Sequence, residues 1–180
     1  MVKTTTNPQA KKAKKKVAKR TAAPIAKSRL PRHRQYGVIP VRFSRDGQIQ
    51  VLLVTSRGTG RWLIPKGWPM RKRTPAGTAE REAFEEAGVK GWLWSHRPIG
   101  SYRYLKQDEN FTGEILVRVF VLVVEELKKR WPEKEERRVR WCTLRQAAAL
   151  VKERDLAKVL RDLPRLLVGE KPTRPMRKKK

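Results

Sequence analysis

The sequence lacks the features that mark secreted and membrane proteins. Cys142 is the only cysteine among 180 residues. No disulfide can form within the chain, which favours a reducing compartment. The longest apolar run, residues 119–124, is strand-sized and falls far short of the ~20 residues of a membrane-spanning helix. The basic N-terminus has no apolar segment of the kind found in secretory signals. We therefore expect a cytoplasmic protein in which Cys142 is buried and unreactive.

Acidic residues are absent from both ends of the chain, and the formal net charge of the whole chain is +28. Residues 1–34 contain twelve Lys or Arg and no acid, and residues 171–180 contain six more. We predict a disordered Lys/Arg-rich tail at 1–34, a globular domain at 35–168 and a basic C-terminal tail at 169–180. Charge of this sign favours anionic partners, either phosphorylated metabolites or nonspecific nucleic acid. The N-terminal tail could bind nucleic acid or simply be solvated, and its composition does not decide between them.

The central segment is predicted to be an α/β domain with a mixed β-sheet. Apolar and β-branched patterns predict strands at 36–43, 49–55, 62–64, 91–94, 99–104, 114–124 and 137–141. Pro40 should place the first strand at an edge or a bulge, and residues 66–74 should form a polar loop. A helix should begin at Thr74-Pro75 and end at Gly88. Two more helices are expected at 144–152 and 156–167, with a break at Pro164.

The first of these helices carries three carboxylates on one side. Glu82, Glu85 and Glu86 share an arc of about 100° at helical spacing. Their mutual repulsion and their place in the C-terminal half of the helix are both unfavourable. A hard divalent cation such as Mg²⁺ or Mn²⁺ would relieve that conflict. A solvated acidic face paired with Arg81 is the competing interpretation. Beside the arc runs a stripe of small residues that suits close packing on a sheet: Ala76, Ala79, Ala83 and Ala87.

A wider pattern around these glutamates resembles the Nudix box. The box reads Gly, five residues, Glu, seven residues, Arg-Glu, an apolar residue, any residue, Glu-Glu, any residue, Gly, an apolar residue. The matching positions are Gly67, Arg81, Glu82, Ala83, Glu85, Glu86, Gly88 and Val89. Arg73 stands where the family has its first Glu, which puts that auxiliary carboxylate in doubt and predicts altered metal number or affinity.

The resemblance implies an α/β/α sandwich and metal-dependent hydrolysis of a phosphoanhydride bond. It assigns Glu85 and Glu86 as metal ligands and Glu82 as a further ligand or general base. The backbone carbonyl of Lys66, before Gly67, would be another ligand. Arg81 would orient the glutamates through salt bridges. Many members also use an acid from a later loop, for which the candidates are Asp108, Glu109 and Glu114.

Several features bear on the substrate. The diphosphoinositol polyphosphate phosphohydrolases are resembled by residues 85–91, Trp131 and residues 140–141. The diadenosine polyphosphate hydrolases are resembled by residues 65–67. Both branches imply a polyphosphate-rich substrate, while ADP-ribose, oxidised nucleoside triphosphates and 5′-triphosphate RNA ends stay open. Candidate phosphate-binding residues, which could equally be surface charges, are Arg57, Arg61, Lys66, Arg71, Lys72, Arg73, Arg103 and Lys106.

A different class of function is also compatible with the sequence. The basic tail and Arg73 would suit a nucleic-acid-binding protein whose Nudix domain is degenerate and non-catalytic. In that interpretation four aromatic residues would stack on bases, whereas in the hydrolase we expect them in the sheet core: Trp92, Trp94, Tyr102 and Tyr104. The two interpretations differ in what Glu86→Gln should do, since only the hydrolase would lose turnover.

Overall fold

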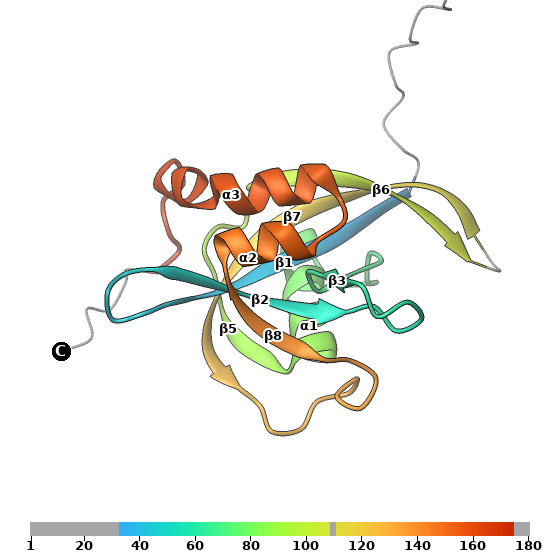
Figure 1. Ribbon diagram of the computed structural model, residues 1–180, viewed down its shortest axis with the longest axis horizontal. Coiled ribbons are helices and arrows are strands. Elements are labelled where there is room, and N and C mark those ends of the chain that lie inside the picture. Colours follow the sequence, from blue (N-terminus) through green and yellow to red (C-terminus); the bar gives the residue numbers. More distant parts are fainter. Residues whose placement is uncertain (1–32, 109–110, 175–180) are drawn as a thin grey trace, which may run out of the picture.

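The computed structural model describes residues 33–108 and 111–174 (Figure 1). The strands are β1 (His33–Phe43), β2 (Ile49–Thr55), β3 (Trp62–Leu63), β4 (Lys66–Gly67), β5 (Val89–Leu93), β6 (Gly100–Asp108), β7 (Phe111–Leu127) and β8 (Val139–Thr143). The helices are α1 (Pro75–Ala87), α2 (Leu144–Leu150) and α3 (Arg154–Val168). The predicted α/β class is confirmed. Predictions for residues 1–32 and 175–180 lie outside the described residues.

The strands form one mixed sheet, as predicted. β1 pairs in parallel with β7 over a long register, from His33 opposite Ile115 to Val41 opposite Val123. The other pairings are antiparallel: β2 with β1, β3 and β8, β4 with β1, and both β5 and β6 with β7. The parallel pair β1–β7 therefore lies at the centre of the sheet, and hairpin-like neighbours extend it on both sides (Figure 1).

Helices cover both faces of the sheet, so the expected α/β/α sandwich is confirmed. On one face α1 packs its alanines against Val38, Leu52 and Phe120. On the other face α2 and α3 cover a larger core that includes Tyr102 and Trp92. Figure 1 shows α2 and α3 together on one side of the sheet and α1 on the other. The four aromatic residues named above belong to the core or pack against it, and Cys142 is buried, as expected.

Three local predictions were wrong. Pro40 lies in a central strand, not at an edge or a bulge. The strand tolerates it because of how β1 is paired on the side that faces β4 and β2. There the Val38 N–H bonds to the carbonyl of Pro65, and the pairing with β2 begins only at Val41. Pro40 therefore stands where β1 changes partners and no N–H is needed.

Pro164 does not break α3, which continues to Val168. Leu160, Leu163 and Leu167 are buried before and after it, so packing on the sheet holds the helix together through the proline. Residues 66 and 67, expected in a loop, form β4 against β1.

Described structure extends past residues 35–168 at both ends. His33 and Arg34 already belong to β1. At the other end, the Thr173 N–H bonds to the Trp94 carbonyl at 2.9 Å, and the Trp94 indole N–H bonds to the Glu170 carbonyl at 3.1 Å. The segment after α3 thus packs back onto the sheet. Within residues 33–108 and 111–174, no helix is long and apolar enough to cross a membrane.

Candidate functional site

Local capping fixes the helix that carries the glutamates. The Thr74 hydroxyl accepts a hydrogen bond from the Gly77 N–H at 3.0 Å, and Pro75 occupies the first helical position. At the other end Gly88 adopts a left-handed conformation with φ 68°, which glycine tolerates without the Cβ penalty of other residues. Both ends agree with the sequence prediction. The alanine stripe is buried, so the glutamates lie along the margin of the packed face.

Glu86 is the most enclosed of the three glutamates. Its Oε2 accepts a hydrogen bond from the Lys66 backbone N–H at 3.2 Å, and its Oε1 accepts one from the Arg137 guanidinium. Burial raises the pKa of Glu86 to about 7, although Arg137 and Lys66 both oppose that shift. The carboxylate is thus held between β4 and the loop before β8.

Glu82 lies directly against β4. A Cβ added to Gly67 would come within 1.8 Å of Glu82 Oε1, so only glycine leaves room for this carboxylate. Burial raises the pKa of Glu82 to about 7, and the negative charges of Glu85 and Glu133 act in the same direction. Gly67 of the box therefore has a clear steric role, which is to let the carboxylate reach the chain at the end of β4.

Glu85 is turned toward Arg81. The Arg81 Nε donates to Glu85 Oε1 at 2.6 Å, a pair separated by one helical turn. The backbone carbonyl of Glu85 accepts the N–H of Glu133 at 3.1 Å, which ties the loop before β8 to α1. The geometry agrees with an orienting role for Arg81.

Arg137 is a residue that sequence reasoning missed. Its side chain is only 7% exposed. It donates to Glu86, to Glu133 and, at 2.8 Å, to the carbonyl of Thr55. No local motif marks it, because it lies 51 residues beyond Glu86 in a run of mixed charges. The only available signal was a mixed-charge segment placed just before a strand.

Lys66 links the glutamates to the opposite face of the sheet. Its backbone N–H contacts Glu86, while its Nζ lies 5.2 Å from the centre of the Tyr104 ring. Burial lowers the pKa of Lys66, and the charges of Glu86 and Glu153 partly offset that effect. The Lys66 carbonyl as a metal ligand stays a prediction.

Of the three expected distal acids, only Glu114 has a described side chain. Glu114 pairs with Arg103 at 3.3 Å on the exposed β6–β7 ribbon. Asp108 is the last residue of β6, and Glu109 lies outside the described residues. Glu153, which precedes α3, is instead the later acid whose charge acts on Lys66. Its side chain is 14% exposed and pairs with Arg61 at 3.4 Å.

Six of the eight candidate phosphate-binding residues fall into two groups. Arg57 pairs with Glu136 at 3.4 Å, and Arg61 and Arg103 pair with acids as just described. Arg71, Lys72 and Arg73 are exposed on the loop after β4. The second group carries its exposed charge on the loop that directly follows Gly67, so this loop is the better placed to meet a phosphate chain at the glutamates.

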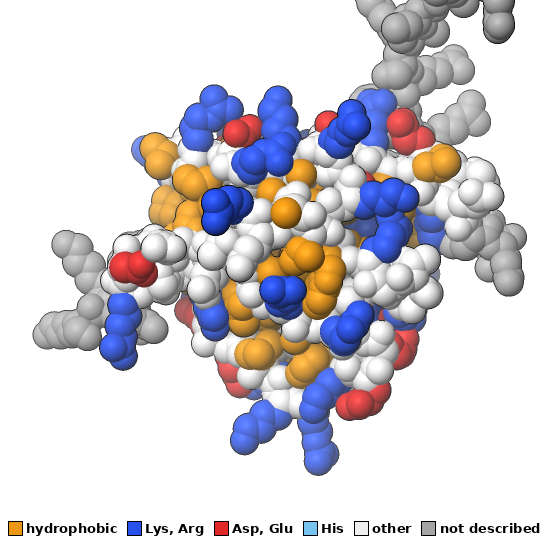
Figure 2. All heavy atoms as spheres, viewed as in Figure 1, with side chains coloured by type: hydrophobic (Ala, Val, Ile, Leu, Met, Phe, Trp, Pro, Cys, Tyr) orange, Lys and Arg blue, Asp and Glu red, His pale blue; other side chains and the backbone are white. Residues whose placement is uncertain are grey.

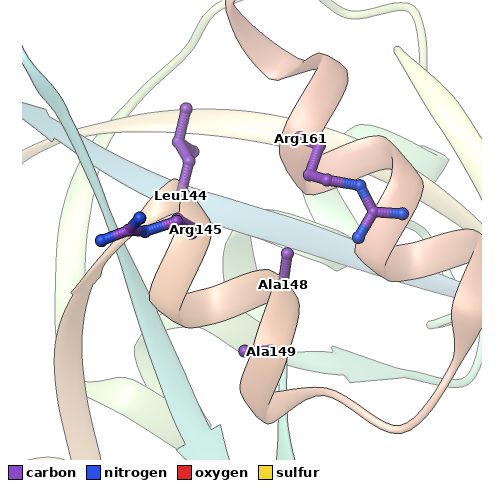
Figure 3. A pocket seen from close by; sticks show the side chains of 5 residues that line it. All are labelled: Leu144, Arg145, Ala148, Ala149 and Arg161. Carbon is purple, nitrogen blue, oxygen red and sulfur yellow. The ribbon is translucent and has the colours of Figure 1, made fainter.

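Two surface hollows differ in their relation to the glutamates. One, of about 490 Å³, lies on α2 and α3 (Figure 3) and is lined by Leu144, Arg145, Ala148, Ala149 and Arg161. It contains no acid. The other, of about 330 Å³, is lined by Thr55, Ser56, Arg57, Gly60, Lys134, Glu135, Glu136, Arg137 and Arg138. Because Arg137 also contacts Glu86, the second hollow adjoins the candidate site.

The donor set suits a hard divalent cation. Glu82 and Glu86 provide carboxylate oxygens that burial makes unfavourable as isolated charges. In the part of the chain that the structure describes, no three acidic, His or Cys side chains already converge as a metal cluster. Glu85 and Glu86 each face an arginine instead. The residues therefore fit such a cation by donor type and position, and full ligation would need Arg81 and Arg137 to release Glu85 and Glu86.

Comparison with known families identifies the class of protein. The NUDIX domain family matches residues 31–163, which is most of the chain. The chain belongs to the Nudix family, whose hydrolases act on pyrophosphate-containing substrates and generally use divalent metal ions.

Curated relatives include plant and mammalian enzymes. The chain is 31% identical over 128 residues to "Nudix hydrolase 12, mitochondrial" of Arabidopsis thaliana, covering 69% of this chain and 63% of the relative. It is 37% identical over 92 residues to "Diphosphoinositol polyphosphate phosphohydrolase 3-beta" of Bos taurus, covering 51% and 52%. The match spans only about half to two thirds of these relatives.

Solved structures support the same fold. The Ap4A hydrolase binary complex of C. elegans aligns with a TM-score of 0.58 at 19% identity, covering 76% of this chain and 98% of that one. The NUDIX domain of Shewanella oneidensis NrtR, complexed with ADP ribose, aligns with a TM-score of 0.56 at 16% identity, covering 74% and 88%. At this identity the likeness establishes the fold.

Proposed function

We propose that this protein is a Mg²⁺- or Mn²⁺-dependent pyrophosphohydrolase. It cleaves a phosphoanhydride bond in a polyphosphate-rich metabolite of the diadenosine polyphosphate or diphosphoinositol polyphosphate type. The observation that carries the proposal is the pair of carboxylates on α1, buried Glu86 and half-buried Glu82, both held against β4. We further propose a cytoplasmic location, supported by the single, buried Cys142.

Each side chain then has a defined task. Glu85 and Glu86, with the Lys66 carbonyl beside Gly67, would hold the cation, which supplies polarisation of phosphoryl oxygens and activation of water. Glu82, whose carboxylate lies against Gly67, would be either a further ligand or the general base. Arg81 keeps Glu85 oriented. Phosphates would be bound chiefly by the exposed cations of the loop after β4: Arg71, Lys72 and Arg73.

An aromatic cluster favours a nucleoside-ended substrate over an inositol one. Trp68, directly after Gly67, is 40% exposed. Its ring centre lies 6.0 Å from that of Phe111 and 6.2 Å from that of His33, and Lys106 Nζ lies 5.7 Å from it. Aromatic faces stack on nucleobases for about 1–3 kcal/mol per base, whereas an inositol ring has no π-face. We therefore place diadenosine polyphosphates first among the candidates.

The test of activity is phosphate release by the purified protein with Mg²⁺ or Mn²⁺. The panel contains diadenosine polyphosphates, diphosphoinositol polyphosphates, ADP-ribose and nucleoside triphosphates, coupled to a phosphatase where needed. Turnover should require both the metal and Glu86, so Glu86→Gln should be folded and inactive. If the folded wild-type protein turns over no member of the panel, the proposal fails.

The preference for diadenosine polyphosphates over diphosphoinositol polyphosphates is tested separately. Trp68→Ala should raise KM for diadenosine tetraphosphate by roughly tenfold or more, given the stacking energy above. The same change should leave KM for a diphosphoinositol polyphosphate within about twofold. Trp68→Phe, which keeps an aromatic face, should restore most of the loss. An equal change on both substrates would instead indicate a general effect on the loop.

The second candidate is a nucleic-acid-binding protein with a non-catalytic Nudix domain. Its support is the net charge of +28 and the exposed Arg73 at the position of the first box glutamate. It predicts salt-sensitive binding of DNA or RNA without turnover. In that event Arg73→Glu, which completes the box, would be the variant to assay for a gain of activity.

A further inference from the structure

Glu86 has no free oxygen in this structure. Its Oε2 accepts the Lys66 backbone N–H, and its Oε1 accepts the Arg137 guanidinium. The two side chains are 5% and 7% exposed, so water barely reaches the pair. A metal ligand of the proposed site is therefore already neutralised by a side chain from another part of the chain.

Arg137 has further partners that do not belong to α1. Its Nε donates to Glu133, and its Nη1 donates to the Thr55 carbonyl at 2.8 Å. Glu133 in turn lies 3.8 Å from Arg57. If the contact with Glu86 opened, the Arg137 guanidinium would still be bonded to the Glu133 carboxylate and the Thr55 carbonyl. The positive charge of Arg137 would therefore not be left buried and unpaired.

Arg137 also borders open space. It helps to line the hollow of about 330 Å³ between the end of β2 and the loop before β8. A guanidinium that leaves Glu86 can therefore shift toward this hollow without displacing core side chains. Glu86 has no such freedom, because it projects from a buried helical position.

We propose that Arg137 is an internal counter-cation that competes with the divalent metal for Glu86 and so sets the metal affinity of the site. The inference rests on the proposed metal site. A divalent cation held by the Glu86 carboxylate would repel a guanidinium on the same group, and at this burial solvent would screen the two charges poorly. Metal binding must then release the Arg137–Glu86 contact, and the strength of that contact lowers the apparent affinity. Arg137 is a positioning residue that acts through Glu86.

The experiment measures metal affinity without turnover. Mn²⁺ binding to the full chain is followed by the loss of the free-ion electron paramagnetic resonance signal. Arg137→Gln removes the competing charge and should bind Mn²⁺ about tenfold more tightly than the wild type. Arg137→Lys keeps the charge but cannot bridge Glu86, Glu133 and Thr55 together, so it should tighten binding only a few-fold. Arg138→Gln, the same charge change one residue away, should match the wild type within about twofold.

Thermal unfolding provides a second readout. Without metal, Arg137→Gln should unfold at a lower temperature than the wild type, because Glu86 loses its partner. Added Mn²⁺ should raise its midpoint by more than it raises that of the wild type. Mn²⁺ affinity of Arg137→Gln equal to or weaker than wild type would overturn the inference. Should that variant fail to fold, Arg137→Lys decides by the same criterion.

Glu86→Gln separates the two proposals. If it binds Mn²⁺ as tightly as the wild type, Glu86 is not a ligand and the proposed metal site itself is wrong. If it loses Mn²⁺ while Arg137→Gln gains nothing, the metal site stands and only the competition by Arg137 is refuted.

Discussion

At the scale of single residues, the site depends on two carboxylates that are poorly solvated. Glu82 and Glu86 each have a pKa of about 7, raised from 4.5 chiefly by burial. In the metal-free protein burial therefore makes these groups easier to protonate in the folded state than in the unfolded chain. Between about pH 5 and about pH 7 the folded protein therefore binds more protons than the unfolded chain, and its free energy of unfolding falls as pH rises.

The stabilisation that metal adds should change with pH in the opposite direction to the stability of the metal-free protein. A cation needs deprotonated ligands, so its affinity should rise through the same window. Thermal midpoints in EDTA should fall between about pH 5 and about pH 7, and the increase caused by Mg²⁺ should be largest at and above about pH 7. In the double variant Glu82→Gln/Glu86→Gln both trends should flatten. A metal-free midpoint that falls equally in the double variant would assign the effect to other groups.

The steric role of Gly67 leads to a second residue-scale prediction. Gly67→Ala would place a Cβ 1.8 Å from Glu82 Oε1 and must displace that carboxylate or β4. Because displacement by about 1 Å can cost on the order of a hundredfold in rate, we expect a severe loss of kcat and of metal affinity. Gly58→Ala meets no atom within 4 Å and is the matched control. Near-normal metal binding by Gly67→Ala would contradict the proposed position of Glu82.

At the scale of elements, α1 was predictable because its signals are local. Thr74, Pro75 and Gly88 lie within one segment and define both ends. By contrast, β4 is two residues long and exists only because β1 lies opposite it. Arg137 and Glu153 reach the site from later segments, so no spacing within the box could reveal them. Pro40 was misassigned because the change of partner along β1 is a tertiary feature.

The N-terminal cap of α1 should carry measurable stability. Thr74→Ala removes the acceptor for the Gly77 N–H and should cost about 1 kcal/mol in free energy of unfolding. For a domain of this size that corresponds to a thermal midpoint lower by roughly 2–4 °C. Thr74→Ser keeps the oxygen and should retain most of the stability in the same denaturant or thermal titration. If the serine variant is as unstable as the alanine variant, the cap bond is not the cause.

At the scale of the whole molecule, positive charge dominates the surface. Lys and Arg side chains are spread over the face seen in Figure 2, with fewer acids between them. The full sequence carries 45 Lys and Arg against 17 Asp and Glu. Such an excess attracts polyanions generally, so affinity for a polyphosphate substrate and affinity for nucleic acid must be separated by experiment.

Removal of residues 1–32 provides that separation. The truncated protein should lose most of its affinity for single-stranded RNA, and the slope of log affinity against log salt should become shallower. Its kcat/KM on the preferred small substrate should stay within about twofold, because the glutamates and their partners lie in the described domain. Substitution of the five lysines within residues 11–16 by glutamine should reproduce part of the effect. Unchanged RNA binding by the truncated protein would assign it to the domain.

The parallel pair at the centre of the sheet has a consequence for the order in which the molecule is assembled. β1 is made first, yet its long partner β7 begins with Phe111, and the register joins residues 82 positions apart, such as His33 and Ile115. Loop closure over that distance must precede the pairing, which slows folding relative to a chain of local hairpins. During synthesis, the apolar faces of β1 and α1 therefore stay exposed to solvent until β7 has left the ribosome. Protection by a chaperone would be needed most in that interval, and truncation before β7 should yield an aggregating chain instead of a smaller enzyme.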